Sequence, residues 1–253
     1  MTMERLNLRT PKPYGKSTQE ESSFNKHIFI VSEGQTEETY FRGVKNYRSD
    51  LHIKNSIEIL VIEKEDKDQG KSHPRQLVDA ALIKMGRLNK DLSPVDKDQW
   101  QEHCEWDYDP DDDMVCVVFD KDYKGLEKEI DYIYDMCSKH KIYIGFSNPN
   151  FEFWLLLHFE NIGQYSRELL LSNPKNIKGK LFPGKSKSKK YLQILLSIRA
   201  EGYKKGSSLK FEKFKDRISL AIKQEKEFEE DVYQLFYNLG SNIGLMIEMI
   251  KDN

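Results

Sequence analysis

The chain has 253 residues, of which 38% are hydrophobic and 32% charged, and its formal net charge at pH 7 is −2. This length allows one α/β core with an extension, or two small domains. Because the net charge is slightly negative, the chain as a whole does not attract nucleic acid. A surface that binds nucleic acid therefore has to be a local basic patch. No apolar stretch approaches the ~20 residues of a membrane span, and we expect a cytoplasmic protein.

The N-terminal part begins with a flexible segment at residues 1–24, because residues 10–19 are rich in Pro, Lys, Ser and Thr. A short apolar run at 27–31 then predicts a strand buried on both faces. Gly34 is expected to give the following turn an unusual backbone angle. Thr36 is expected to cap a helix that extends from Glu37 to residue 47.

The next part of the chain predicts a strand at 57–62, a polar loop at 63–72 and a helix from Pro74 to residue 85. Residues 89–113 form a polar insertion that ends in a crowd of acidic residues. A solvated loop and a calcium site are both open here, although the spacing lacks the glycine and final glutamate of an EF-hand.

The most apolar run, at 114–119, predicts a third strand that ends abruptly in Asp120, Lys121 and Asp122. A helix at 126–139, a strand at 142–146 and a helix at 151–159 are expected to follow. Pro149 suits the start of the last helix. Asn148 either caps that helix or lies where backbone amides hold a phosphate. His158 is expected in the core.

Strand and helix thus alternate four times, which predicts an α/β fold with a parallel sheet of about four strands and helices on both faces. This domain is expected to cover residues 25–160. Strand patterns end there, so residues 161–253 are predicted to form a helical C-terminal extension. Its expected helices are 168–171, 191–199, 211–239 and 243–250.

Carboxylates follow the predicted strands at their carboxyl ends, where ligands of such sheets bind. Glu33 follows the first strand, Asp120 and Asp122 the third, and Glu152 lies in the first turn after the fourth. Residues two apart on an extended segment point the same way, which suits Asp120 and Asp122. Converging carboxylates need compensation, and Mg²⁺ with oxygen ligands supplies it. The number of metal ions, one or two, is left open, and Mn²⁺ is expected to be able to replace Mg²⁺.

A basic segment at 173–191 contains seven lysines and no acidic residue. Such a segment can follow a phosphate backbone without reading bases, although a plain solvated loop is the alternative. Lys121 and Lys124, beside the acidic pair, are candidates to offset phosphate charge. The lysines of the segment are Lys175, Lys178, Lys180, Lys185, Lys187, Lys189 and Lys190.

Three blocks of the sequence resemble RloB-like proteins. Residues 30–41 read Ile-Val-Ser-Glu-Gly-Gln-Thr-Glu-Glu-Thr-Tyr-Phe and resemble the opening signature of that family, while residues 118–122 resemble its acidic strand end. Residues 147–159 read Ser-Asn-Pro-Asn-Phe-Glu-Phe-Trp-Leu-Leu-Leu-His-Phe and resemble a third block. The resemblance covers about residues 27–160.

The resemblance implies a Toprim-like, Rossmannoid fold, shared with topoisomerases, DnaG-type primases and OLD-type nucleases. It implies an acid–base or metal-binding role for Glu33 and Mg²⁺ binding by Asp120 and Asp122. By the same resemblance Glu152 would be a further metal ligand. RloB-like proteins are associated with an AAA-type, RloA-like ATPase in restriction or phage-defence loci, which implies such a partner here.

The main hypothesis is therefore a metal-dependent endonuclease acting on DNA or RNA, tRNA included, in host defence. The alternative is a non-catalytic nucleic-acid-binding or sensor subunit of an ATPase complex. A primase-like polymerase ranks last, because no zinc ribbon is present. ATP hydrolysis is expected to come from a partner. Homo-oligomerisation is left open.

Overall fold

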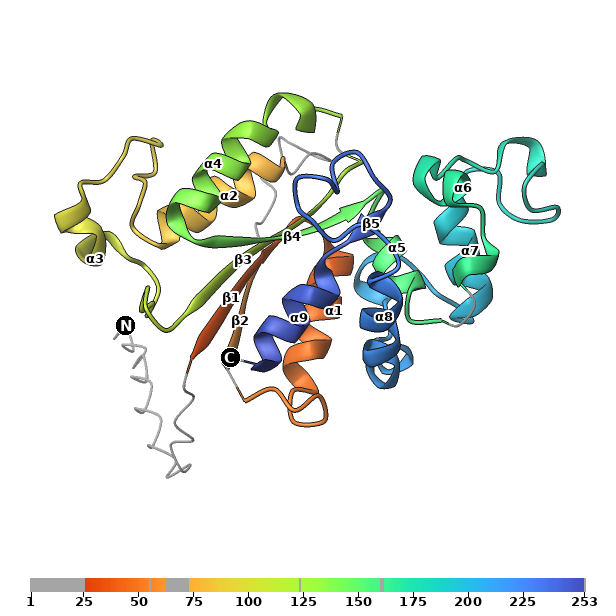
Figure 1. Ribbon diagram of the computed structural model, residues 1–253, viewed down its shortest axis with the longest axis horizontal. Coiled ribbons are helices and arrows are strands. Elements are labelled where there is room, and N and C mark those ends of the chain that lie inside the picture. The colour runs from red at the N-terminus through yellow and green to blue at the C-terminus, as the bar shows by residue number, and fades with distance from the viewer. Residues whose placement is uncertain (1–25, 55, 62–72, 123, 160–161, 253) are drawn as a thin grey trace, which may run out of the picture.

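The computed structural model describes residues 26–54, 56–61, 73–122, 124–159 and 162–252 (Figure 1). The predicted N-terminal segment, the polar loop 63–72 and the side chain of Lys178 lie outside the described part of the chain. Among the described helices, none is both long and apolar enough to cross a membrane.

The centre of the fold is a five-stranded sheet in the order β2-β1-β3-β4-β5. The first four strands are parallel, and β5 pairs antiparallel with the end of β4. This confirms the predicted α/β fold and its four parallel strands. The sequence did not predict β5, because two residues carry no periodicity. The strands are β1 His27–Ser32, β2 Ser56–Val61, β3 Met114–Asp120, β4 Ile142–Asn148 and β5 Gly240–Ser241.

Helices cover both faces of the sheet, as expected (Figure 1). Helices α1, α5, α8 and α9 pack on one face, and α2 and α4 pack on the other. The helices are α1 Gln35–Asn46, α2 Pro74–Lys84, α3 Trp100–His103, α4 Ile130–His140, α5 Phe151–Leu156, α6 Arg167–Ser172, α7 Tyr191–Arg199, α8 Ile218–Glu225 and α9 Ile243–Asp252.

One apolar cluster joins residues from both sides of the boundary predicted near residue 161. Phe41 of α1, Trp154 of α5, Leu192 of α7 and Met246 of α9 are all fully buried in it. His158 is buried in the same cluster, where its Nε2 lies 3.1 Å from the hydroxyl of Tyr40. The residues after 160 thus contribute to the core that supports β1 and β3.

The acidic insertion packs partly on the other face of the sheet. The ring of Trp106 stacks on Phe29 of β1 with the ring centroids 4.5 Å apart. The carboxylate of Asp113 accepts backbone N–H bonds from His27 and Asp109. The carboxylates at the end of the insertion therefore serve turns and the entry to β1, which favours the solvated-loop interpretation over a calcium site.

The single helix predicted for 211–239 is wrong. The chain forms two short 3-10 turns, Phe211–Lys213 and Lys215–Arg217, then α8, and continues without regular structure to β5. Leu235 and Phe236 are buried on the opposite face of the sheet from α8, so the chain has to cross the sheet end. Asp231 also accepts the N–H groups of Tyr233 and Gln234, and such local bonds compete with a helix.

Candidate active site

Two predicted carboxylates meet at the carboxyl ends of adjacent central strands. Glu33 directly follows β1 and Asp120 is the last residue of β3, and the two strands pair side by side up to Ser32 and Val118. The backbone N–H of Asp120 lies 3.5 Å from Oε2 of Glu33. Asp120 is buried, and burial raises the pKa of its carboxyl group well above the ordinary value. The carboxylates of Glu37, Glu33, Asp122 and Glu152 add to that rise.

Glu152, in the first turn of α5, lies at the same edge of the sheet as Glu33 and Asp120. Its side chain is 1% exposed, and its Oε1 lies 3.2 Å from Nζ of Lys205 and 3.4 Å from Nε2 of Gln193. Its Oε2 is buried without a hydrogen-bond partner. The helix start that follows β4 therefore delivers a carboxylate to the same place as the two strand ends.

Glu37 belongs to the same group, although its sequence context suggested only a favourable charge in the first turn of a helix. It is buried, and this burial raises the pKa of its carboxyl group to about 7, with Lys205 opposing the rise and Glu152 and Asp122 adding to it. The signal that could have revealed it is its place in the first turn of α1, because that helix begins two residues after Glu33. We refer to Glu33, Glu37, Asp120, Asp122 and Glu152 as the acidic edge.

Asp122 is placed differently from Asp120. The strand ends at Asp120, and Lys121 and Asp122 lie in the following turn, so the extended segment that was expected to align the two carboxylates is absent there. The side chain of Asp122 is 38% exposed, and its Oδ2 lies 2.7 Å from Nζ of Lys190. Asp122 thus contributes to the solvent side of the acidic edge.

Lys205 is a further site residue that sequence reasoning missed. Burial works against its charge, but the carboxylates of Glu152, Asp120 and Glu37 outweigh it and raise the pKa of the Lys205 ammonium. The backbone N–H of neighbouring Gly206 donates to Oγ1 of Thr36 over 2.9 Å, which fixes this segment to the start of α1. No local pattern around Lys205 marks it, because only the tertiary fold brings it to the edge.

Three turn residues have roles other than those predicted. Gly34 has an extended backbone (φ −134°), but a Cβ at this position would lie 2.6 Å from Oε2 of Glu37, so the glycine is needed for space. Thr36 lies inside α1 and binds Gly206, while Gly34 occupies the N-cap position. Pro149 follows a cis peptide bond and precedes the helix, which begins at Phe151.

Asn148 holds the backbone of a neighbouring loop. Its Nδ2 donates to the carbonyl oxygens of Leu235 and Phe236 over 2.8 and 3.4 Å. Asn150, which makes no side-chain capping bond, occupies the N-cap position of α5, so Asn148 does not cap this helix. Because its amide nitrogen is bound to protein carbonyls, the side chain of Asn148 is committed to the fold and cannot also donate that bond to a phosphate.

The basic segment is folded around one buried side chain. Asn176 donates to the carbonyl of Phe182 and accepts the N–H groups of Leu181 and Phe182. Among the described lysines of the segment, Lys190 binds the acidic edge, through Asp122. The other described lysines of the segment are exposed: Lys175, Lys180, Lys185, Lys187 and Lys189.

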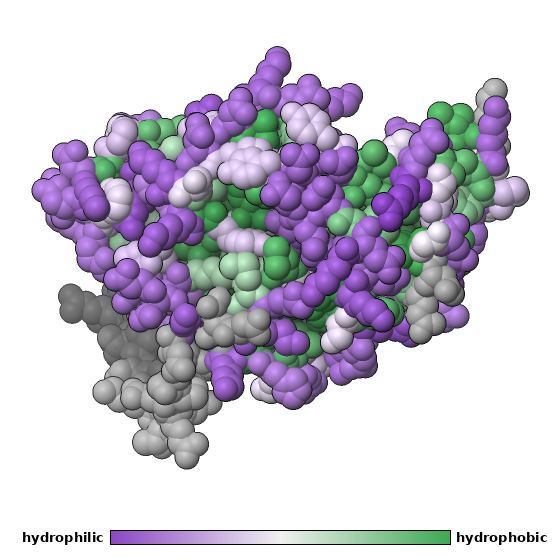
Figure 2. Space-filling model, viewed as in Figure 1, coloured by the Kyte–Doolittle hydropathy of each residue, from purple (hydrophilic) through white to green (hydrophobic). Residues whose placement is uncertain are grey.

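Two further lysines flank the edge at the end of β3. Nζ of Lys121 lies 3.4 Å from the ring centroid of Phe236 and 3.9 Å from Oε1 of Glu127. Lys124 is exposed. Figure 2 shows the molecular outline dipping between the body and the arm formed by α6 and α7. The acidic edge is thus bordered by cationic side chains from the turn after β3 and from the basic segment.

The chemistry of the acidic edge fits a hard divalent cation. No three His, Cys, Asp or Glu side chains among the described residues lie close enough together to surround one metal ion. Mg²⁺, however, keeps several waters and commonly takes only one or two carboxylates. Oδ1 of Asp120 and Oε2 of Glu152 are buried without hydrogen-bond partners, which is costly for a carboxylate oxygen. These oxygens suit Mg²⁺ or Mn²⁺ better than softer metals.

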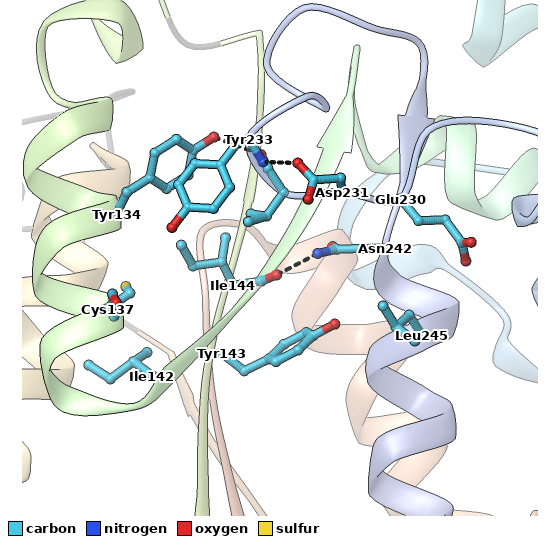
Figure 3. Close-up of a pocket in the computed structure, with 12 residues that line it drawn as sticks. Tyr134, Cys137, Ile142, Tyr143, Ile144, Glu230, Asp231, Tyr233, Asn242 and Leu245 are labelled. Carbon is cyan, nitrogen blue, oxygen red and sulfur yellow. Dashed lines mark hydrogen bonds between the residues drawn. The ribbon is translucent and has the colours of Figure 1, made fainter.

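A separate pocket of about 370 Å³ lies beside the amino-terminal half of β4 (Figure 3). Tyr134 of α4, Tyr143 of β4 and Tyr233 line it, together with Asn242, whose Nδ2 donates to the carbonyl of Ile144. No member of the acidic edge lines this pocket. The candidate active site is therefore the open carboxyl edge of the sheet and not this pocket.

Comparison with known proteins agrees with the three sequence blocks. The model of the RloB-like protein family matches residues 28–250. The chain belongs to the RloB-like protein family. A search among curated proteins found no match, and neither did a search among solved structures. The RloB-like match extends beyond residue 160 and includes α7 and Lys205, so the family region covers all parts of the site. Family membership by itself does not establish an activity.

Proposed function

We propose that this RloB-like chain is a Mg²⁺-dependent nuclease that hydrolyses phosphodiester bonds in DNA or RNA. The observation that carries the proposal is the convergence of three buried carboxylates, Glu37 of α1, Asp120 of β3 and Glu152 of α5, beside half-buried Glu33. Asp120 and Glu152 each have an unpartnered oxygen. Buried like charges at one sheet edge destabilise the fold unless a cation compensates them. A cluster of buried carboxylates lowers the stability of the fold and is typical of functional sites.

In this proposal Asp120 and Glu152 hold the metal through their unpartnered oxygens, with Glu33, Glu37 and Asp122 around them. Mg²⁺ held there would polarise a phosphate and lower the pKa of a water molecule. Glu33 acts as ligand or general base. Lys121, Lys190 and Lys205 offset the charge of the phosphate. The exposed lysines of the basic segment position the rest of the strand without reading its sequence.

We further propose that the chain acts with an AAA-type ATPase in restriction or phage defence, which rests on the family association alone. Residues 179–186 match the Gly-x-x-x-x-Gly-Lys-Ser pattern, but they follow a 3-10 turn and lie in further turns, not between a strand and a helix, so the partner would supply ATP hydrolysis. Such a partner would also regulate access to the acidic edge.

The decisive experiment is a cleavage assay with the full chain, with and without the proposed AAA-type ATPase partner. Single-stranded DNA, duplex DNA and tRNA are incubated in Mg²⁺, Mn²⁺ or EDTA with the wild type, Asp120→Asn and Asp98→Asn. Asp98 is exposed and lies in the acidic insertion, so Asp98→Asn is the matched control.

We expect cleavage that requires metal, falls at least about 100-fold in Asp120→Asn and is unchanged in Asp98→Asn. Equal cleavage by both variants would show that the acidic edge is not catalytic. Strand binding without cleavage, with the ATPase present, would favour a sensor subunit.

A further inference from the structure

The loop that crosses the sheet end carries exposed aromatic rings beside the acidic edge. We refer to residues 229–239 as the aromatic loop. Its Tyr237 is 73% exposed and Tyr233 is 52% exposed. Figure 1 shows the loop in blue, beside β5 and the carboxyl end of β4.

The backbone of the aromatic loop is held in place from three sides. The N–H of Glu229 donates to the carbonyl of Leu239, and the N–H of Ser241 donates back to Glu229, which closes the loop at its base. Asn148 binds the carbonyl oxygens at positions 235 and 236. The hydroxyl of Tyr134 donates to the carbonyl of Val232. The exposed rings therefore stand on a fixed frame.

The side chains divide the loop into an anchored part and a free ring. Leu235 and Phe236 are buried against the apolar cluster that contains Phe119 and Phe146. The ring of Tyr237 contacts Phe236 edge-on, with the centroids 5.0 Å apart, and otherwise faces solvent. Since Phe236 is rigidly placed, Tyr237 is displayed in a defined position at little cost in conformational entropy.

The frame also connects this ring to the proposed site. Nζ of Lys121 lies 3.4 Å from the ring centroid of Phe236, and Lys121 directly follows Asp120. The backbone N–H of Lys121 donates to Ser147 of β4, so the lysine is fixed between the acidic edge and the aromatic loop. Lys121 and the exposed ring of Tyr237 thus both contact Phe236, next to a carboxylate site.

We propose that Tyr237 is a stacking platform for an unpaired base, and that the substrate of the acidic edge is a single-stranded segment of nucleic acid. This inference rests on the proposed nuclease function. An exposed ring and a lysine held by the same neighbour match a nucleotide, because the base stacks on the ring while the phosphate meets the cation. Bases in a duplex are already stacked on their neighbours, so the Tyr237 ring favours single strands or loops over duplexes.

Tyr233 provides a matched control within the same loop. Its ring packs edge-on against Tyr134 with the centroids 4.6 Å apart and lines the pocket beside β4, as Figure 3 shows. It therefore faces α4. The variants to compare are Tyr237→Ala, Tyr237→Phe and Tyr233→Ala, with a thermal unfolding curve for each.

The test measures binding in EDTA, so that no strand is cut, to four probes of equal length. These are single-stranded DNA carrying 2-aminopurine, single-stranded RNA, duplex DNA and an abasic DNA strand. Tyr237→Ala should bind both single strands about 5- to 150-fold more weakly, while binding to duplex and abasic strands stays unchanged. Tyr237→Phe and Tyr233→Ala should bind like the wild type. The ratio of the affinities for single-stranded DNA and single-stranded RNA shows which of the two nucleic acids supplies the stacked base.

Equal binding of single strands by the wild type and Tyr237→Ala would overturn the inference, as would an equal loss on the abasic strand. Metal-dependent cleavage by the same preparations separates the two proposals. If cleavage persists while Tyr237→Ala binds normally, only the stacking role fails. If the wild type neither binds nor cuts any strand, both proposals fail.

Discussion

Nζ of Lys190 lies 2.7 Å from Oδ2 of Asp122, which joins the basic segment to the acidic edge. Both side chains are about one-third exposed, so the pair contributes little to folding. Its location at the end of the basic segment suggests a different role, because a phosphate that approaches Asp122 also meets Lys190.

Lys190→Gln should therefore lower the free energy of unfolding by less than about 1 kcal/mol. It should weaken binding to nucleic acid for every sequence and reduce the salt-dependence slope of binding by about one. Fluorescence titrations at several salt concentrations measure this slope. Lys54→Gln, at an exposed position near the amino end of β2, is the control and should leave the slope unchanged. Identical slopes for both variants would show that Lys190 does not contact the phosphates of the nucleic acid.

Gly34→Ala should impair cleavage without unfolding the protein. The extended backbone at residue 34 accepts alanine, but the new Cβ would lie 2.6 Å from Oε2 of Glu37 and displace that carboxylate. We expect single-turnover cleavage to fall at least about tenfold, because a displacement near the reacting groups is costly. Gly163→Ala is the matched control, since a Cβ there has no neighbour within 4 Å. Unchanged cleavage by Gly34→Ala would show that the position of Glu37 is unimportant.

His158 should make stability depend on pH. Burial lowers the pKa of its imidazole to about 3 in the folded chain, against 6.5 for an exposed histidine. Between these values the unfolded chain binds more protons, so stability is fully present above pH 6.5 and falls as pH decreases. The loss approaches about 1.4 kcal/mol per pH unit.

Urea unfolding of the wild type and His158→Gln at pH 7 and pH 5 measures this effect. The variant should be less stable at pH 7, because the Tyr40 hydroxyl loses its partner at Nε2, but should show a shallower decline toward pH 5. Parallel declines would mean that His158 binds a proton in the folded chain as readily as in the unfolded chain.

Asn148→Ala should loosen the aromatic loop. The change removes the two bonds from Nδ2 to the carbonyl oxygens of Leu235 and Phe236 and leaves buried acceptors unsatisfied, at about 1–3 kcal/mol. Hydrogen exchange should increase in residues 229–239 and not in α2. Asn238→Ala, which loses only an exposed bond to Gln234 within the loop, is the control. Equal exchange in both variants would show that Asn148 does not hold the loop.

The sequence predicted the parts of the site that lie at strand ends. Apolar runs locate parallel strands, and carboxylates directly after them share an edge, so Glu33 and Asp120 could be brought together from the pattern alone. Glu152 followed from its place after β4. Glu37 was missed because its position in the first turn of a helix already had an ordinary explanation.

The remaining errors concern residues whose positions depend on distant contacts. Lys205 reaches the edge because Gly206 binds Thr36, a contact that no local spacing encodes. The helix predicted across residue 230 fails because Leu235 and Phe236 are buried on the opposite face of the sheet from α8. Periodicity reports which residues are apolar but not which face of the sheet receives them.

The late position of β5 in the chain has a consequence for synthesis. Gly240 and Ser241 pair with the end of β4, and Lys205 and the aromatic loop also come from the last fifth of the sequence. A ribosome releases β1 to β4 before these segments, so all five carboxylates of the acidic edge are synthesised while Lys205, β5 and the aromatic loop are still missing. The proposed site is therefore assembled in full only when translation is nearly finished.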